Sequence, residues 1–183
     1  MTGDYLKRGM VLLLCFISTW NAGCSRKSPC AFIDGLKSYS SLNETRSVIS
    51  RSRDVNTWTE THREFESRKT GKRDRTVTLT GPYKSLGFAG TLTLSFFNDQ
   101  LARADFGVSA SNGKAYADAF QRSSGIALRV GQAVKSNDGA TLVCLLRDDS
   151  YHFIWDDARL IDEWTKATDQ NYIGAGGLHN DTR

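Results

Sequence analysis

Alternation of apolar and polar residues is clearest in the middle of the chain. Residues 91–97 place two leucines and a phenylalanine on one side, which is the period of a half-buried strand. Asn98-Asp99 suits a tight hairpin turn, and a return strand is expected over about 101–108. Its inward face would carry Ala102, Ala104, Phe106 and Val108, and its outward face Arg103 and Asp105. Strands of this kind predict an antiparallel sheet with one covered face and one wet face.

Further strands are expected on both sides of this hairpin, at residues 76–80, 126–130, 141–146 and 151–155. Gly81-Pro82 is typical of a turn and would end the first of them. The segment 141–146 is nearly continuous in apolar residues, which favours a central strand. Asp148-Asp149-Ser150 then predicts a turn into the last strand.

A first helix is predicted near the start of this region. Ser41-Leu42-Asn43-Glu44 fits a capping box, in which serine and glutamate bond each other's backbone amides. Apolar residues then recur at helical spacing, so a helix is expected over about 41–53. A continuation of the helix through Trp58 and Phe65 is the other option.

Two later helices are predicted in the same way. The segment 113–123 would place Tyr116, Ala119 and Phe120 on one stripe. Asp156 or Asp157 would cap a last helix, whose apolar residues are Leu160, Ile161 and Trp164.

This order of elements predicts an α+β fold, an antiparallel sheet with two or three helices on one face. Residues 41–167 would form the single domain and 168–183 a flexible tail. The segments 90–94 and 139–145 look alike, which suggests two helix-plus-three-strand halves, although shared hairpin preferences explain the likeness equally. The outline is similar to β-lactamase-inhibitor-like folds and small outer-membrane assembly lipoproteins, a resemblance that implies a fold alone.

The beginning of the chain has a different character. Lys7 and Arg8 precede an apolar run from Met10 to Trp20. The run is shorter than the roughly 20 residues of a membrane-spanning helix, and it has the length of a signal-peptide core. Residues 1–23 are therefore expected to be a signal peptide.

Ala22-Gly23-Cys24 follows this run and resembles the end of the lipobox of bacterial lipoproteins, whose usual form is Leu-Ala-Gly-Cys. Asn21 stands where leucine is usual. The resemblance implies that Cys24 is acylated and becomes the mature N-terminus, followed by a lipidated tether over 24–40. Ser25, rather than aspartate, implies the periplasmic face of the outer membrane. A plain secreted protein and an uncleaved anchor are the alternatives.

Length and charge limit the class of protein. The chain has 183 residues, of which 39% are hydrophobic and 24% charged, values that fit one globular domain and exclude a disordered or fibrous chain. A net charge of +4 is mild, so nucleic acid is not an expected partner.

The cysteines suggest one possible crosslink. Cys15 falls in the signal peptide and Cys24 at the lipidation position, which leaves Cys30 and Cys144. In an oxidising compartment this pair is a candidate disulfide, and two buried thiols are the alternative. No spacing is typical of a zinc site, so neither a metal nor a cofactor is expected.

Catalytic patterns are weak. No G-x-S-x-G segment is present. Of the three histidines, His62 fits a solvated helix face, His152 a sheet face beside aromatic residues, and His179 the tail. Acidic residues gather late in the chain, where paired carboxylates could act on a glycosidic bond, although turn and cap roles explain most of them. These residues are Asp148, Asp149, Asp156, Asp157, Asp162 and Glu163.

Two surface hypotheses remain. A basic segment could contact anionic lipid, or be a solvated loop; its cations are Arg68, Lys69, Lys72, Arg73 and Arg75. Tyr83, Leu86 and Phe88 could form a partner face. The sequence thus predicts a non-enzymatic, lipid-anchored envelope protein that binds another envelope protein or a cell-wall component. An envelope or secreted hydrolase using the late carboxylates and an inhibitor of a secreted enzyme are the alternatives.

Overall fold

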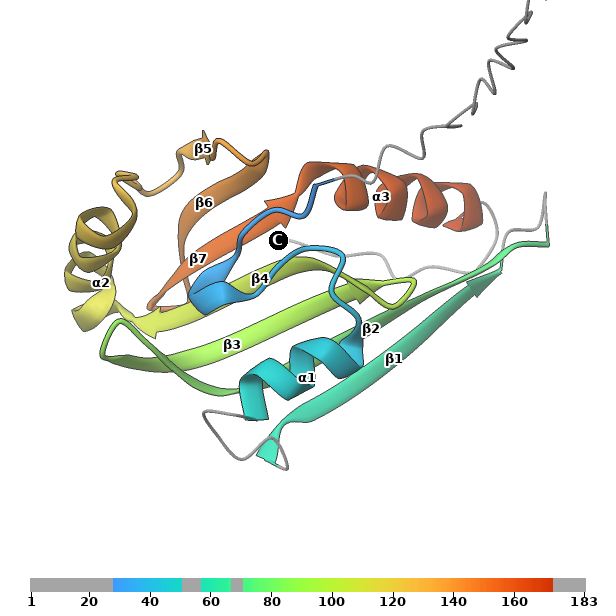
Figure 1. Cartoon of the computed structure of the whole chain (residues 1–183), viewed down its shortest axis with the longest axis horizontal. Helices are drawn as coiled ribbons and strands as arrows, with labels where there is room; N and C mark the ends of the chain where they lie inside the picture. The colour runs from blue at the N-terminus through green and yellow to red at the C-terminus, as the bar shows by residue number, and fades with distance from the viewer. Residues whose placement is uncertain (1–27, 51–56, 67–70, 173–183) are drawn as a thin grey trace, which may run out of the picture.

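The computed structural model describes residues 28–50, 57–66 and 71–172. It is an α+β fold, as expected: a seven-stranded antiparallel sheet in the order β1-β2-β3-β4-β7-β6-β5, with three α-helices packed on it (Figure 1). The elements are η1 (Ile33–Gly35), α1 (Leu42–Ser50), β1 (Thr59–Glu66), β2 (Arg73–Ser85), β3 (Phe88–Phe97), β4 (Gln100–Ser109), α2 (Ala110–Ser124), β5 (Ala133–Lys135), β6 (Ala140–Arg147), β7 (Ser150–Asp157) and α3 (Ala158–Tyr172).

Local signals in the sequence position several of these elements. The capping box is confirmed: Ser41 Oγ accepts the Glu44 N–H at 3.2 Å, and a Glu44 carboxylate oxygen accepts the Ser41 N–H at 2.7 Å. Asn98-Asp99 and Asp148-Asp149 both form the expected turns, with φ of 48° and 67° in the first and 46° and 58° in the second. Tight hairpin turns need such positive φ values, which asparagine and aspartate tolerate.

The expected turn at Gly81-Pro82 is wrong, because β2 continues through both residues to Ser85. The Trp58 ring lies over Gly81, where a Cβ atom would stand 2.3 Å from it. Pro82 lies beyond Thr80, the last residue of β2 that pairs with β1. A strand tolerates proline where one edge is unpaired.

Three other segments also differ from expectation. The region around His62 is edge strand β1 and not a helix, with all eight residues paired to β2. Residues 126–130 form no strand; only Val130 makes an isolated bridge, to Cys144. The segment 141–146 lies in β6, which is next to the short edge strand β5 and not in the centre of the sheet. One face of β6 alone is buried, so its apolar run is not fully enclosed.

The fold begins before residue 41, which corrects the expected tether over 24–40. The segment 28–41 contributes to the core through Cys30, Phe32, Ile33, Leu36 and Ser38, each at most 6% exposed. A bridge between Ala31 and Lys37 closes this segment on itself. At the other end α3 runs to Tyr172, beyond the expected boundary at 167.

Most buried side chains form one cluster on a single sheet face, under α2, α1 and the segment 28–41. A register shift between Ser95 and Phe96 changes one expectation. Ala102 does not join this cluster but packs with Phe97 and Leu160 in a second cluster under α3.

The described helices and strands follow the order α1, four strands, α2, three strands, α3. The two expected helix-plus-three-strand halves therefore differ by one strand.

Candidate functional site

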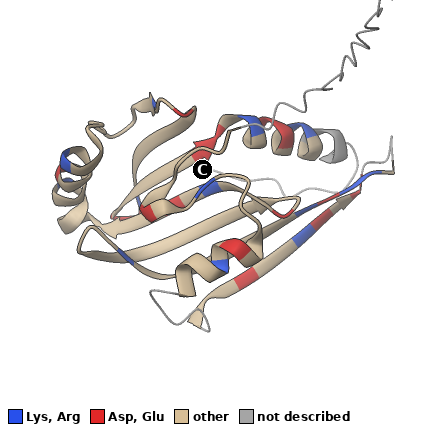
Figure 2. Cartoon of the chain, viewed as in Figure 1, with Lys and Arg blue, Asp and Glu red and all other residues tan. Residues whose placement is uncertain are grey.

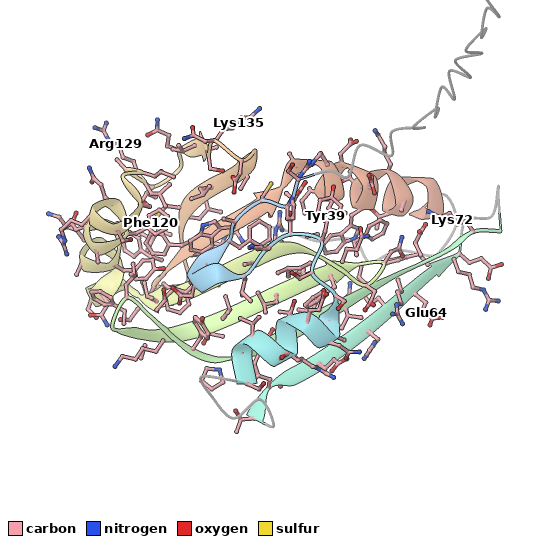
Figure 3. The ribbon with its side chains drawn as sticks, viewed as in Figure 1. Tyr39, Glu64, Lys72, Phe120, Arg129 and Lys135 are labelled. Carbon is pink, nitrogen blue, oxygen red and sulfur yellow. The ribbon has the colours of Figure 1, made fainter. Side chains whose placement is uncertain are left out.

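An apolar groove of about 350 Å³ opens between the segment 28–41, the end of α2 and the turn from β5 to β6. Its walls are Phe32, Phe120, Ile126, Leu142 and Trp155, and its polar rim is Ser124, Ser136, Asn137 and Asp138. Figure 3 shows Phe120 on the side of α2 that faces the rest of the fold, while Arg129 and Lys135 project outward. We call this feature the apolar groove.

The end of α2 shapes one wall of the apolar groove. Gly125 adopts φ 74° and donates its N–H to the Gln121 carbonyl at 2.8 Å, which ends the helix. The Ser124 hydroxyl donates to the Phe120 carbonyl at 2.7 Å and accepts the Ile126 N–H at 3.1 Å. The chain therefore turns back and brings Ile126 beside Phe120. Phe120 meets Trp155 edge to face, with ring centroids 5.8 Å apart.

Asp138 joins the rim of the groove to the N-terminal segment. Its carboxylate accepts the Ala31 N–H, the Ser136 hydroxyl and, at 3.3 Å, the Ala140 N–H. Burial alone would raise the pKa of Asp138, but these hydrogen bonds outweigh it and hold the pKa below the usual range. The rim therefore carries a stable negative charge.

A second polar cluster, centred on Asp157, fixes the same segment to the start of α3. Asp157 accepts hydrogen bonds from Ser38 Oγ at 2.8 Å and Cys30 Sγ at 3.2 Å, and Arg159 pairs with it at 2.7 Å. Arg159 also donates to the Ser28 carbonyl at 2.8 Å. Burial opposes ionisation of Asp157, yet the hydrogen bonds from Arg159 and Ser38 hold its pKa well below the usual range.

Cys30 and Cys144 are free, buried thiols, so the candidate disulfide is not present in the structure. Cys30 lies beside Asp157, whose strand partner on β6 is Ala140. Cys144 is four residues further along β6, about 13 Å at the rise of a strand, and a disulfide needs Cα atoms within about 7 Å. Burial and the neighbouring Asp157 raise the pKa of Cys30 to about 11, so its thiol stays protonated at neutral pH.

The expected partner face is not a continuous surface. Tyr83 is 7% exposed and belongs to the core, with its ring edge-on to Trp58 and Phe106. Phe88 packs against Tyr116 with centroids 5.7 Å apart. Of the three residues proposed, only Leu86 is exposed, at the turn between β2 and β3.

The described part of the basic segment carries mixed charge. Lys72 pairs with Asp74 at 2.9 Å, and Arg73 and Arg75 pair at 3.4 Å with Glu66 and Asp99, respectively. Acidic and basic residues alternate at this end of the sheet (Figure 2). Arg68, Lys69 and the lipidation candidate Cys24 lie outside the described residues.

Two of the late carboxylates, Asp156 and Asp162, form ion pairs, and neither lines the apolar groove. Asp156 makes a two-pronged pair with Arg103, at 2.6 and 2.9 Å, and Asp162 pairs with Lys166 at 2.6 Å. His152 bonds Asp105 at 2.9 Å, a partner that the sequence did not indicate. The strand register places this pair and the Arg103–Asp156 pair on the sheet face opposite the main cluster.

Sequence reasoning missed most of the apolar groove. Trp155 was recognisable as the end of an expected strand over 151–155, and Phe120 as part of a helical stripe. Ile126 and the rim residues gave no sign of sharing a site with them. The available signals were Gly125, which ends a helix, and the turn-forming run 136–139.

The fold and the groove define an α+β protein with an apolar groove beside its N-terminal segment. Neither a protein-family model nor a curated protein matches the chain. Within residues 28–50, 57–66 and 71–172, no helix meets the length and hydropathy of a membrane span. In the same part of the chain, no cluster of three or more His, Cys, Asp or Glu side chains could hold a metal ion.

Proposed function

We propose that this protein is a non-enzymatic, lipid-anchored binding protein of the cell envelope, held at the periplasmic face of the outer membrane. The apolar groove is the observation that supports a binding function. Its volume of about 350 Å³ is in the range of ligand pockets, which combine apolar walls with a few polar groups. The lipobox-like Ala22-Gly23-Cys24 supports the anchored half.

The chemistry of the reactive side chains supports binding over catalysis. Cys30 has a raised pKa, which is the opposite of what a nucleophilic thiolate needs. Asp156 and Asp157 are each neutralised by an arginine. The hydrolase alternative would gain support if the protein cleaved a cell-wall or ester substrate and Asp156→Asn abolished that cleavage.

Lipidation of Cys24 predicts a specific mass for the mature protein. Protein extracted from the membrane fraction should have the mass of residues 24–183 plus acyl chains, because multiple chains are needed for stable anchoring. The Cys24→Ala variant should lack the acyl mass and remain unprocessed or soluble. An unacylated wild-type product in the soluble fraction would contradict the anchor.

Binding is tested with a neutral fluorescent apolar probe, N-phenyl-1-naphthylamine. The described residues between 28 and 172 supply one main core cluster, so the chain starting at residue 25 is suitable and avoids detergent. We expect saturable binding with one probe per chain. Asn137→Trp should weaken it at least tenfold, because Asn137 is an exposed residue on the groove rim and an indole there fills the mouth.

Asn112→Trp is the matched control, since Asn112 is an exposed residue near the start of α2, at the end opposite Phe120. It adds the same ring without touching the groove, and its probe affinity should equal that of the wild type. Thermal unfolding of both variants verifies that they are folded. Absence of saturable wild-type binding, or equal loss in both variants, would refute the groove as a binding site.

A further inference from the structure

Three of the rim residues of the apolar groove, Ser124, Ser136 and Asp138, use polar side-chain atoms in hydrogen bonds within the protein. Ser124 bonds the backbone at Phe120 and Ile126, and the single hydroxyl proton of Ser136 is shared between Asp138 and the Ala140 carbonyl, which lies 3.2 Å from Ser136 Oγ. Asp138 in turn accepts three hydrogen bonds from its surroundings. A ligand entering the groove therefore meets hydrocarbon walls, and its own buried portion must be apolar because buried polar groups without partners are costly.

The N-terminal segment enters the fold directly beside the groove. Ser28 is held by Arg159, Cys30 by Asp157 and Ala31 by Asp138, and Ala31 itself lies in the groove lining. These successive contacts fix the position of the backbone between Ser28 and the groove. Cys24 is four residues before Ser28, a span of at most about 14 Å even when fully extended.

From these contacts we infer that the apolar groove binds the acyl chain of a membrane lipid. The inference rests on the proposed function, because lipidation of Cys24 would place the membrane surface within about 25 Å of Ala31, the reach of seven extended residues. At that distance lipid is the most abundant apolar molecule. The negative charge of Asp138 at the rim disfavours an anionic head, so a neutral or zwitterionic lipid fits best.

The test is displacement of bound N-phenyl-1-naphthylamine by monoacylglycerols of increasing chain length, each below its micelle concentration. Affinity should rise about fourfold per added methylene until the groove is filled, as apolar burial requires. Asn137→Trp should lose this dependence and Asn112→Trp should keep it. The corresponding fatty acids at neutral pH should bind more weakly than the monoacylglycerols.

The outcomes separate this inference from the proposed function. If the probe binds and no monoacylglycerol displaces it, the acyl-chain inference is wrong while the binding function stands. If neither binds, the proposed function fails. The acylated protein from membranes should also take up monoacylglycerol. If the acylated protein takes up no monoacylglycerol while the Cys24→Ser variant does, the groove holds the protein's own lipid. That result would overturn the inference that the groove binds the acyl chain of a membrane lipid.

Discussion

Tyr116→Ala should lower the free energy of unfolding by about 3–5 kcal/mol, the usual range for loss of a large buried aromatic side chain. Tyr116 is fully buried. Its ring centroid lies 4.5 Å from that of Phe153 and 5.1 Å from that of Phe106. Truncation would leave a cavity between α2 and the centre of the sheet. The free energy of unfolding of small domains is only about 5–15 kcal/mol. Tyr116→Ala should therefore remove a large fraction of it.

Tyr116→Phe is the comparison for this prediction. It keeps the ring and removes the hydroxyl, which bonds Ser85 Oγ at 3.3 Å, so its cost should be about 1 kcal/mol. Urea unfolding followed by circular dichroism measures both variants. Equal losses would show that the hydrogen bond, and not the ring packing, dominates at this position.

Asp157→Asn should destabilise the protein by about 2–3 kcal/mol at neutral pH. The Asp157 side chain is 1% exposed and that of its partner Arg159 is 38% exposed. Loss of the carboxylate removes the charge that Arg159, Ser38 and Cys30 all bond. The cost is below that of breaking a fully buried pair, because water can still solvate the arginine.

The effect should depend on pH in a defined direction. The folded pKa of Asp157 is depressed, so its stabilisation is complete above the unfolded carboxyl pKa of about 3.9. It is lost as the pH falls towards the folded value. The difference in unfolding free energy between wild type and Asp157→Asn should therefore shrink between about pH 5 and the acid limit of folding.

Asp162→Asn provides the control, since it removes an exposed carboxylate from a pair with Lys166 in the same helix. Such pairs contribute only about 0.3–0.5 kcal/mol. A similar cost for both variants, or a difference for Asp157→Asn that grows in acid, would contradict the role of the Asp157 cluster.

Elements with strong local signals were predictable from the sequence. The alternation in β3, the Asn98-Asp99 turn and the Ser41 capping box each depend on neighbouring residues alone, and each is found where expected. The N-terminal cap of α3 belongs to this group, because Asp157 accepts the Arg159 N–H at 3.0 Å. The overall class follows from these elements and the antiparallel alternation.

Features that depend on distant contacts were not predictable. Strand β1 has few apolar residues and is defined by its pairing with β2. The register shift after Ser95 moves Ala102 to another cluster without a sequence signal. The apolar groove joins side chains from Phe32 to Trp155, so no local pattern could bring them together.

We propose that the apolar groove is the binding site of this protein. The most direct measurement is photolabelling of the chain starting at residue 25 with a neutral diazirine derivative of the naphthyl probe, followed by peptide mapping. We predict that the label lies in residues 120–126 or on the groove walls Phe32 and Trp155, and that Asn137→Trp removes it. Label concentrated instead on the exposed side chains of Leu86, Val130 or Leu146 would contradict the claim.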